Sequence, residues 1–161
     1  MPRFELSKSN SDDPTEGEWV SLAINRSMGR LATAFFDALF GRELRVGSGI
    51  PEDLKPRLER LVSPGERRNR PARVIAASRL SYLFAVDPGW AHTWLLPSFD
   101  WADELEALAV WQGYAWQPRL QESLWRSLKP HFLDAFAPER LQRLGDMGQN
   151  SLAEMLMGGR G

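Results

Sequence analysis

Apolar side chains recur every three or four residues along most of this chain, which is the spacing of one face of an α-helix. From residue 19 onward the rhythm is clear around Phe35, Leu58, Leu83 and Leu108. No stretch alternates apolar and polar residues with comparable strength. The pattern therefore predicts an all-α fold with helices of about 10 to 18 residues.

Prolines and aspartates mark where several helices should begin. Asp87 followed by Pro88 predicts a helix N-terminus, because aspartate is a favoured N-cap and proline is tolerated in the first turn. Pro51 and Pro138 are expected to open helices in the same way. Short turns between such helices predict antiparallel helix pairs, arranged as a short irregular α-solenoid of HEAT or armadillo type or as a helical bundle.

Three further segments add detail to this prediction. Residues 72–86 are apolar on most sides, so the helix expected there should lie between other helices. Asp100 and Asp103 imitate a capping box at the start of a later helix. Pro130 falls within the apolar pattern of residues 121–136. It must kink that helix or begin a new one, because proline removes a backbone donor.

The N-terminal segment differs from the rest of the chain. Residues 1–17 are mostly polar without a periodic apolar pattern, and they are expected to form a flexible lead-in to one helical domain over residues 18–161. They lack the continuous apolar region of a secretory signal. No apolar run approaches the roughly 20 residues that span a bilayer. We expect a cytoplasmic protein without membrane contact.

Composition narrows the possible chemistry. The absence of cysteine excludes disulfides, thiol nucleophiles and cysteine-ligated metals. His131 and Asp134 share one helical face but lack a third metal ligand. The net charge of -1 gives no overall attraction to nucleic acid or to an anionic membrane. Arginine supplies most of the basic residues, a bias that often accompanies a GC-rich bacterial genome.

The sequence contains no complete catalytic or cofactor-binding motif. Residues 47–49 resemble the first half of a dinucleotide-binding fingerprint, but Glu52 occupies the position of the third glycine, so we interpret them as a turn. Ser98 and Asp100 lie near His92 in the sequence without a nucleophile elbow. We therefore expect a protein that is not an enzyme and binds no cofactor or metal.

One segment of the chain is strongly basic. Residues 55–79 carry eight basic and two acidic residues, a balance of +6, and the basic ones are Lys55, Arg57, Arg60, Arg67, Arg68, Arg70, Arg73 and Arg79. Residues 81–106 carry five acidic residues and no Lys or Arg. The arginines either form a phosphate-binding patch or cover helix faces and pair with that acidic stretch. Arg67, Arg68, Arg70 and Arg73 are the candidates for partner contact.

Tryptophan is unusually frequent in this chain. Seven tryptophans occur in 161 residues, and six of them lie between residues 90 and 125. Such large rings dominate either a core or an interface. We expect most of them in the core and one or two on a partner-binding groove, for which Trp90, Trp94 and Trp116 are the candidates.

Five segments carry a resemblance to a known family. They are NRSMGRLATAFFDALF (25–40), ARVIAASRLSYLFAVDPGW (72–90), LLPSFDW (95–101), WQGYAWQPRL (111–120) and LKPHFL (128–133). The chain resembles a helical region of unknown function that lies C-terminal to a sirtuin-like, NAD-consuming domain in large bacterial proteins, many of them suspected of anti-phage defence. The resemblance implies an α-solenoid sensor or scaffold. It implies no catalytic residue, because the glycine-rich loop and catalytic histidine of the sirtuin-like domain are missing here.

Together, these observations favour a non-catalytic helical-repeat interaction or scaffold domain. Its expected partner is another protein or a second copy of the chain. The resemblance implies that it acts with a sirtuin-like NAD-consuming defence domain, as a sensor or an oligomerisation module. The alternative is a nucleic-acid or phosphate-binding helical module that uses the basic block at residues 55–79.

Overall fold

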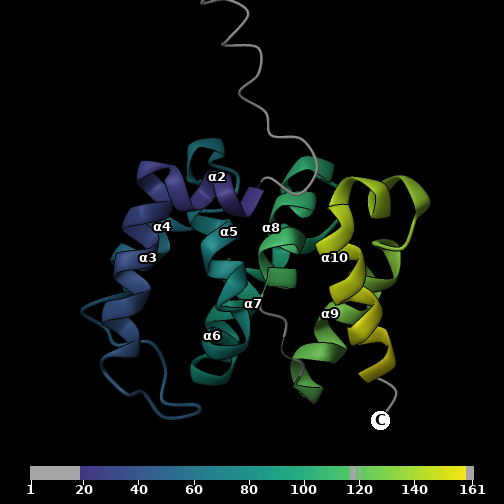
Figure 1. Cartoon of the computed structure of the whole chain (residues 1–161). Coiled ribbons are helices and arrows are strands. Elements are labelled where there is room, and N and C mark those ends of the chain that lie inside the picture. Colours follow the sequence, from purple (N-terminus) through teal and green to yellow (C-terminus); the bar gives the residue numbers. More distant parts are fainter. Residues whose placement is uncertain (1–18, 117–118, 120, 159–161) are drawn as a thin grey trace, which may run out of the picture.

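Helices make up most of the structure, a computed structural model that describes residues 19–116, 119 and 121–158. These residues contain no β-strand, so the all-α prediction is confirmed for them. The lead-in predicted over residues 1–17 lies outside the described part. With η denoting a 3-10 helix, the elements are α2 (Trp19–Asn25), α3 (Ser27–Phe40), α4 (Lys55–Leu61), η1 (Arg67–Asn69), α5 (Arg70–Ser78), α6 (Leu80–Val86), α7 (Pro88–Trp94), η2 (Leu96–Phe99), α8 (Glu104–Trp116), α9 (Glu122–Asp134) and α10 (Pro138–Gly158) (Figure 1).

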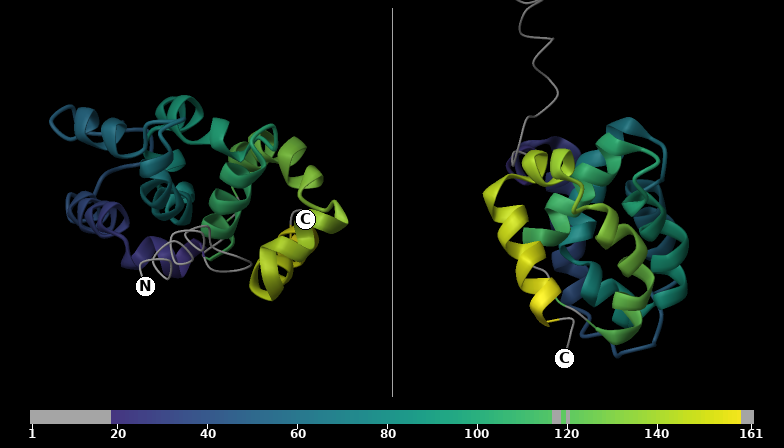
Figure 2. Two further views of the ribbon diagram at one scale, coloured as in Figure 1. Left: turned by 90° about the horizontal axis from the view of Figure 1, so that it is seen from above. Right: turned by 90° about the vertical axis from the view of Figure 1, so that its right-hand side faces the viewer.

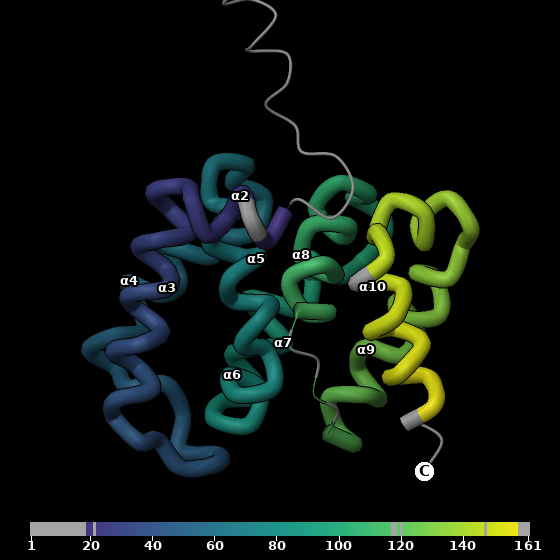
Figure 3. The backbone as a smooth tube through the Cα atoms, viewed as in Figure 1, coloured from purple at the N-terminus to yellow at the C-terminus, as the bar shows by residue number. Residues whose placement is uncertain are grey.

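The helices follow one another across the molecule in rough chain order. α3 and α4 form one end and α9 and α10 form the other, as the left view of Figure 2 shows. α3 packs on α5, α5 packs on α8, and α8 packs on α10. The tube in Figure 3 shows α5 and α8 between the two ends. Each of these two central helices therefore has neighbours on both sides.

Burial is greatest on α5 and α8. Residues 72–77 of α5 and residues 106–115 of α8 are all buried. The two helices approach closely at Gly113, where a Cβ atom would lie 2.4 Å from the carbonyl oxygen of Val74. Only glycine lets the backbones come so near. The expectation that residues 72–86 lie between other helices is confirmed for residues 72–77, which belong to α5.

One predicted helix is divided in the structure, and another continues through its proline. The segment 72–86 forms two helices rather than one, α5 and α6, with a break at Arg79 (φ -109, ψ 13). The hydroxyl of Ser78 donates to Ile75 O (2.5 Å), while the N–H of Arg79 bonds to Ala76 O, only three residues back. This local side-chain bond competes with the helical ladder. α9, in contrast, continues through Pro130, so no new helix begins there.

Asp87 organises the start of α7. Its Oδ1 accepts a hydrogen bond from Trp90 N (3.0 Å), and α7 begins at the next residue, which confirms the predicted N-cap. Its Oδ2 accepts from Ile50 N (3.2 Å), which ties the preceding loop to the same carboxylate. Gly47 and Gly49 have positive φ angles of 75° and 83°. Residues 47–49 are therefore a turn, as the sequence predicted.

The other predicted helix starts have mixed outcomes. α10 begins at Pro138, as expected. Pro51 does not open a helix: it begins a turn, and α4 starts four residues later. The capping assignment at Asp100 is also wrong, because α8 starts at residue 104 and Asp103 accepts from Glu106 N (3.2 Å). Asp100 accepts instead from the N–H two residues ahead.

Candidate protein-interaction groove

Two arginines of the basic segment lie inside the protein. Arg70 and Arg73, in the first turn of α5, pair with Glu106 of α8. The Glu106 carboxylate accepts from Arg70 Nε (2.8 Å) and from Arg73 Nε (2.6 Å) and Nη2 (2.9 Å). Only 2% of Arg73 and 6% of Glu106 are exposed. The predicted pairing of the arginines with the acidic stretch is confirmed for Arg70 and Arg73.

This cluster of Arg70, Arg73 and Glu106 has a structural role. Arg73 Nη1 also donates to Ser63 O (2.6 Å), and the Arg70 guanidinium lies 5.4 Å from the centre of the Trp19 ring. The cluster thus joins α5, α8, α2 and the segment after α4. Arg70 and Arg73 were predicted to contact a partner. Their burial leaves almost no surface for such contact, so we correct that assignment.

The remaining predicted arginines lie on the surface. Arg67 and Arg68 are both exposed at the start of η1. Arg68 also lines a groove between α3 and α4, together with Met28, Leu31, Phe35, Pro56, Arg57, Glu59, Arg60, Leu61, Ser63, Glu66, Asn69 and Trp94. The groove has a volume of about 930 Å³, which is within the range of specific binding sites, about 300 to 1,000 Å³.

One wall of this groove is an apolar stripe on α3. Met28, Leu31 and Phe35 follow one another at intervals of three and four residues, so they occupy one helical face. Leu31 is 55% exposed, and Met28 and Phe35 are half-buried against the core. A different stripe of α3, which includes Ala32 and Phe36, packs inward. α3 therefore has apolar side chains both toward the core and toward the groove.

Two tryptophans of α7 lie at the groove or behind it. Trp94 lines the groove and is half-buried. Its ring stacks on that of Trp90, with the ring centres 6.5 Å apart. Trp90 is buried, and its indole N–H donates to Glu59 Oε2 (3.1 Å). Trp90 thus supports the groove from within the core instead of facing a partner, which corrects its predicted role.

The polar lining of the groove is mixed in charge, with an excess of cations. Arg57, Arg60 and Arg68 oppose two carboxylates, those of Glu59 and Glu66. One of these carboxylates already accepts the indole hydrogen bond described above. The three arginines are exposed, and arginine forks suit carboxylate recognition.

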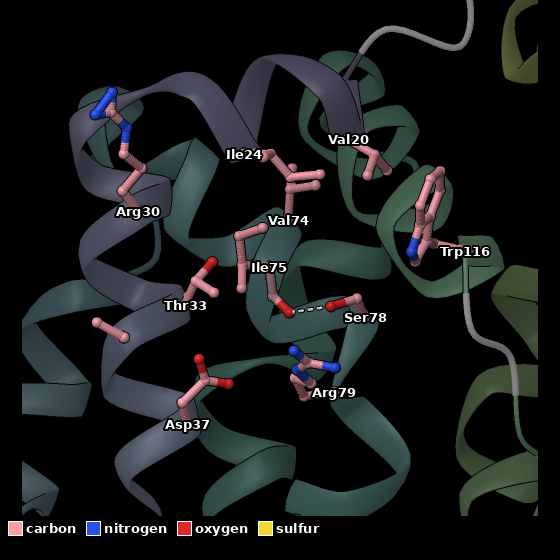
Figure 4. A pocket seen from close by; sticks show the side chains of 11 residues that line it. Val20, Ile24, Arg30, Thr33, Asp37, Val74, Ile75, Ser78, Arg79 and Trp116 are labelled. Atoms are coloured by element: carbon pink, nitrogen blue, oxygen red, sulfur yellow. Dashed lines mark hydrogen bonds between the residues drawn. The ribbon is translucent and has the colours of Figure 1, made fainter.

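Trp116, the third tryptophan candidate, lies at a different place. It is 45% exposed and lines a smaller pocket of about 470 Å³ between α2, α3, α5 and α8. In Figure 4, its ring stands on the far side of this pocket from Asp37, with Ile24 and Val20 along the upper edge. The structure therefore brings Arg68 and Trp94 together in one groove, and it places Trp116 in another.

The prediction that most of the tryptophans lie in the core is confirmed. Trp19, Trp90, Trp101 and Trp111 are buried, and Trp94 and Trp125 are half-buried. Of the seven tryptophans, Trp116 is the exposed one. Most of the rings belong to the core, and a minority reaches a groove.

The structure does not group the sequence candidates for catalysis or metal binding into a site within the described residues. Ser98 is buried in η2, and the hydroxyl near His92 is instead that of Ser127, 3.2 Å from His92 Nε2. Among the described residues, no three His, Asp or Glu side chains are grouped so that they could hold a metal ion. No described helix has the length and apolar character needed to cross a membrane.

Comparison of the chain with protein-family models, with curated protein sequences and with solved structures gives no match. The groove is therefore interpreted from its own residues. Sequence reasoning missed its α3 wall, although one signal was present. α3 carries apolar residues at 28, 31 and 35 in addition to those at 32, 36 and 39, which is broader than one core-facing stripe requires.

Proposed function

We propose that this chain is a non-catalytic helical interaction domain that binds a protein partner in the groove between α3 and α4. The observation that carries the proposal is Leu31, a large apolar side chain that is 55% exposed between Met28 and Phe35 in a groove that arginine side chains also line. Interface hot spots combine apolar anchors, aromatic rings and arginine in this way. The residues that line the groove include no histidine.

The resemblance to sirtuin-associated helical regions suggests an identity for the partner. In this proposal, the domain acts with a sirtuin-like NAD-consuming defence domain, as a sensor or an oligomerisation module. An adjacent reading frame that encodes a sirtuin-like domain would support this assignment. If no neighbouring reading frame encodes such a domain, the proposal that the partner is a sirtuin-like domain would be contradicted.

A nucleic-acid-binding role is the second candidate, and one observation favours it. Arg57, Arg60, Arg67 and Arg68 are all exposed within one short stretch of chain. Such a cluster would attract phosphates, and its binding would weaken steeply with salt. The carboxylates of the same groove and its apolar wall oppose this role, so we rank it second.

The protein-binding proposal is tested by variants that place a charge in the groove. Leu31→Glu should abolish partner binding and leave the melting temperature nearly unchanged, because the side chain is 55% exposed and lies outside the buried core. Val46→Glu is the matched control, since Val46 is 84% exposed and does not line the groove. Affinity capture from the host, quantified for the wild type and both variants, is the measurement.

The expected result is a set of proteins that the wild type and Val46→Glu retain and that Leu31→Glu loses. Identical sets for all three proteins would refute the groove as the binding surface. Cleavage of NAD by the purified chain, without any partner, would refute the non-catalytic role.

A further inference from the structure

We infer that the occupant of the α3–α4 groove is an amphipathic α-helix that carries acidic residues beside its apolar stripe. This inference rests on the proposed function and adds the conformation and the charge of the partner segment.

The shape of the wall favours a helical occupant. Met28 and Phe35, with Leu31 between them, are seven residue steps apart on α3, a length of about 10 Å, or two helical turns, at about 1.5 Å per step. Ridges of side chains spaced three and four residues apart pack against the grooves of another helix with the same spacing. A partner helix of about three turns would cover this stripe.

Backbone chemistry disfavours an extended occupant. Both walls, α3 and α4, are helices whose backbone groups largely bond within their own helices. The groove therefore offers no strand edge that could pair with the backbone of an extended peptide. Such a peptide would place its own N–H and C=O groups against an apolar wall without hydrogen-bond partners, which is unfavourable for the free energy of binding. A helix satisfies these groups internally and presents only side chains.

The charges around the groove define the partner further. Its lining carries three arginines against two glutamates, and Glu59 already accepts from the buried indole of Trp90. Asn69, another lining residue, directly precedes Arg70 of the buried cluster. That cluster contains two guanidinium groups and one carboxylate, and Arg73 donates to Ser63 O of the lining, so it adds a net positive charge next to the groove. Acidic side chains on the occupant complement this field.

The same arrangement separates a protein helix from a nucleic acid. A phosphate backbone is anionic along its whole length, so it would meet Glu59 and Glu66 as well as the arginines. It would also cover Leu31 and Met28 without offering an apolar surface to them. An amphipathic helix places carboxylates only where the arginines are, and apolar residues elsewhere.

A peptide-display selection against the whole folded chain tests the inference without knowledge of the natural partner. The probe is a library of random peptides of about 16 residues, long enough for about four helical turns. Enriched peptides should carry apolar residues at intervals of three and four, with net negative charge. The best peptide should bind Leu31→Glu at least about tenfold more weakly than the wild type, as expected for a hot-spot residue.

Two further measurements separate the conformation from the charge. A proline placed in the middle of the best peptide should weaken binding at least about tenfold, because it breaks a helix. The double reversal Arg60→Glu with Arg68→Glu should weaken binding several-fold and reduce its dependence on salt. Arg126→Glu is the matched control, since Arg126 is exposed on α9, where it pairs with Glu122 of the same helix, and it does not line the groove. It should leave binding unchanged.

The possible outcomes distinguish this inference from the proposed function. Peptides that depend on Leu31 but are basic, rich in proline or alternating in pattern would overturn the inference and keep the groove as a binding site. If no enriched peptide depends on Leu31, both fail. Oligonucleotide binding that is lost in the Arg60→Glu, Arg68→Glu variant and is unaffected by Leu31→Glu would replace the helix with a nucleic acid.

Discussion

Removal of the buried carboxylate at Glu106 should strongly destabilise this protein. Glu106→Gln keeps the size of the side chain but removes the charge that faces Arg70 and Arg73. The wild-type carboxylate accepts three hydrogen bonds of 2.6 to 2.9 Å. In the variant, the amide NH₂ group would point at a guanidinium donor, and two buried cations would lack a counter-charge.

The expected cost follows from the burial of these groups. Breaking a buried ion pair from one side typically costs about 3 to 5 kcal/mol. Arg73 is 2% exposed, so solvent cannot compensate for the lost partner, and a value in this range is expected. For a domain of this size, each kcal/mol lowers the melting temperature by about 2 to 4 °C. The predicted decrease is therefore about 6 to 20 °C.

The assay is urea unfolding followed by tryptophan fluorescence, for which four buried indoles provide the signal. A second variant tests the reasoning itself. The combined substitution of Arg70→Met, Arg73→Met and Glu106→Leu removes every charge of the cluster at once. It should cost much less than Glu106→Gln, because replacement of a buried ionic cluster by apolar residues is often neutral or stabilising.

Two results would refute this account of the cluster. If Glu106→Gln lowers the free energy of unfolding by less than about 1 kcal/mol, the carboxylate contributes no more than one in a surface ion pair does. A triple variant less stable than the single one would show that the packing of these side chains matters more than their charges.

Two other substitutions probe buried side chains of α6 and α8. Leu83→Ala on α6 should lower the free energy of unfolding by about 2 to 5 kcal/mol through lost burial and a cavity, because Leu83 is fully buried. An unchanged melting temperature would show that Leu83 does not belong to the core. Burial raises the pKa of Tyr114, whose hydroxyl donates to Arg119 O (2.8 Å). The unfolded chain therefore ionises first, and stability should fall as the pH rises above about 10. Urea unfolding of the wild type and of Tyr114→Phe, measured from about pH 9 to 11 around the ordinary tyrosine pKa, tests this. The stability of Tyr114→Phe should fall less steeply with pH, and an equal fall in both proteins would contradict the role given to the buried tyrosine.

The sequence alone predicts the features of this protein that depend on near neighbours. The three-to-four spacing of apolar residues predicts the all-α class, and the aspartate at position 87 with the proline after it predicts the start of α7. Pro138 predicts the start of α10. A cap involves residues only about three positions apart, so its chemistry can be read directly from the chain. The helix start predicted at Pro51 was wrong because the local sequence there fits two structures: a proline suits a turn as well as the first turn of a helix.

The tertiary structure decides which side chains of a given type face the solvent. Arg68 and Arg70 are two residues apart in one basic segment, yet one lines the groove and the other is buried against a carboxylate 36 residues away. No local pattern distinguishes them, because burial depends on where α8 packs. The groove likewise needs α3, α4 and Trp94 to meet in space. The sequence supplied its arginines and one of its rings, and the packing of distant helices joined them to the apolar stripe around Leu31.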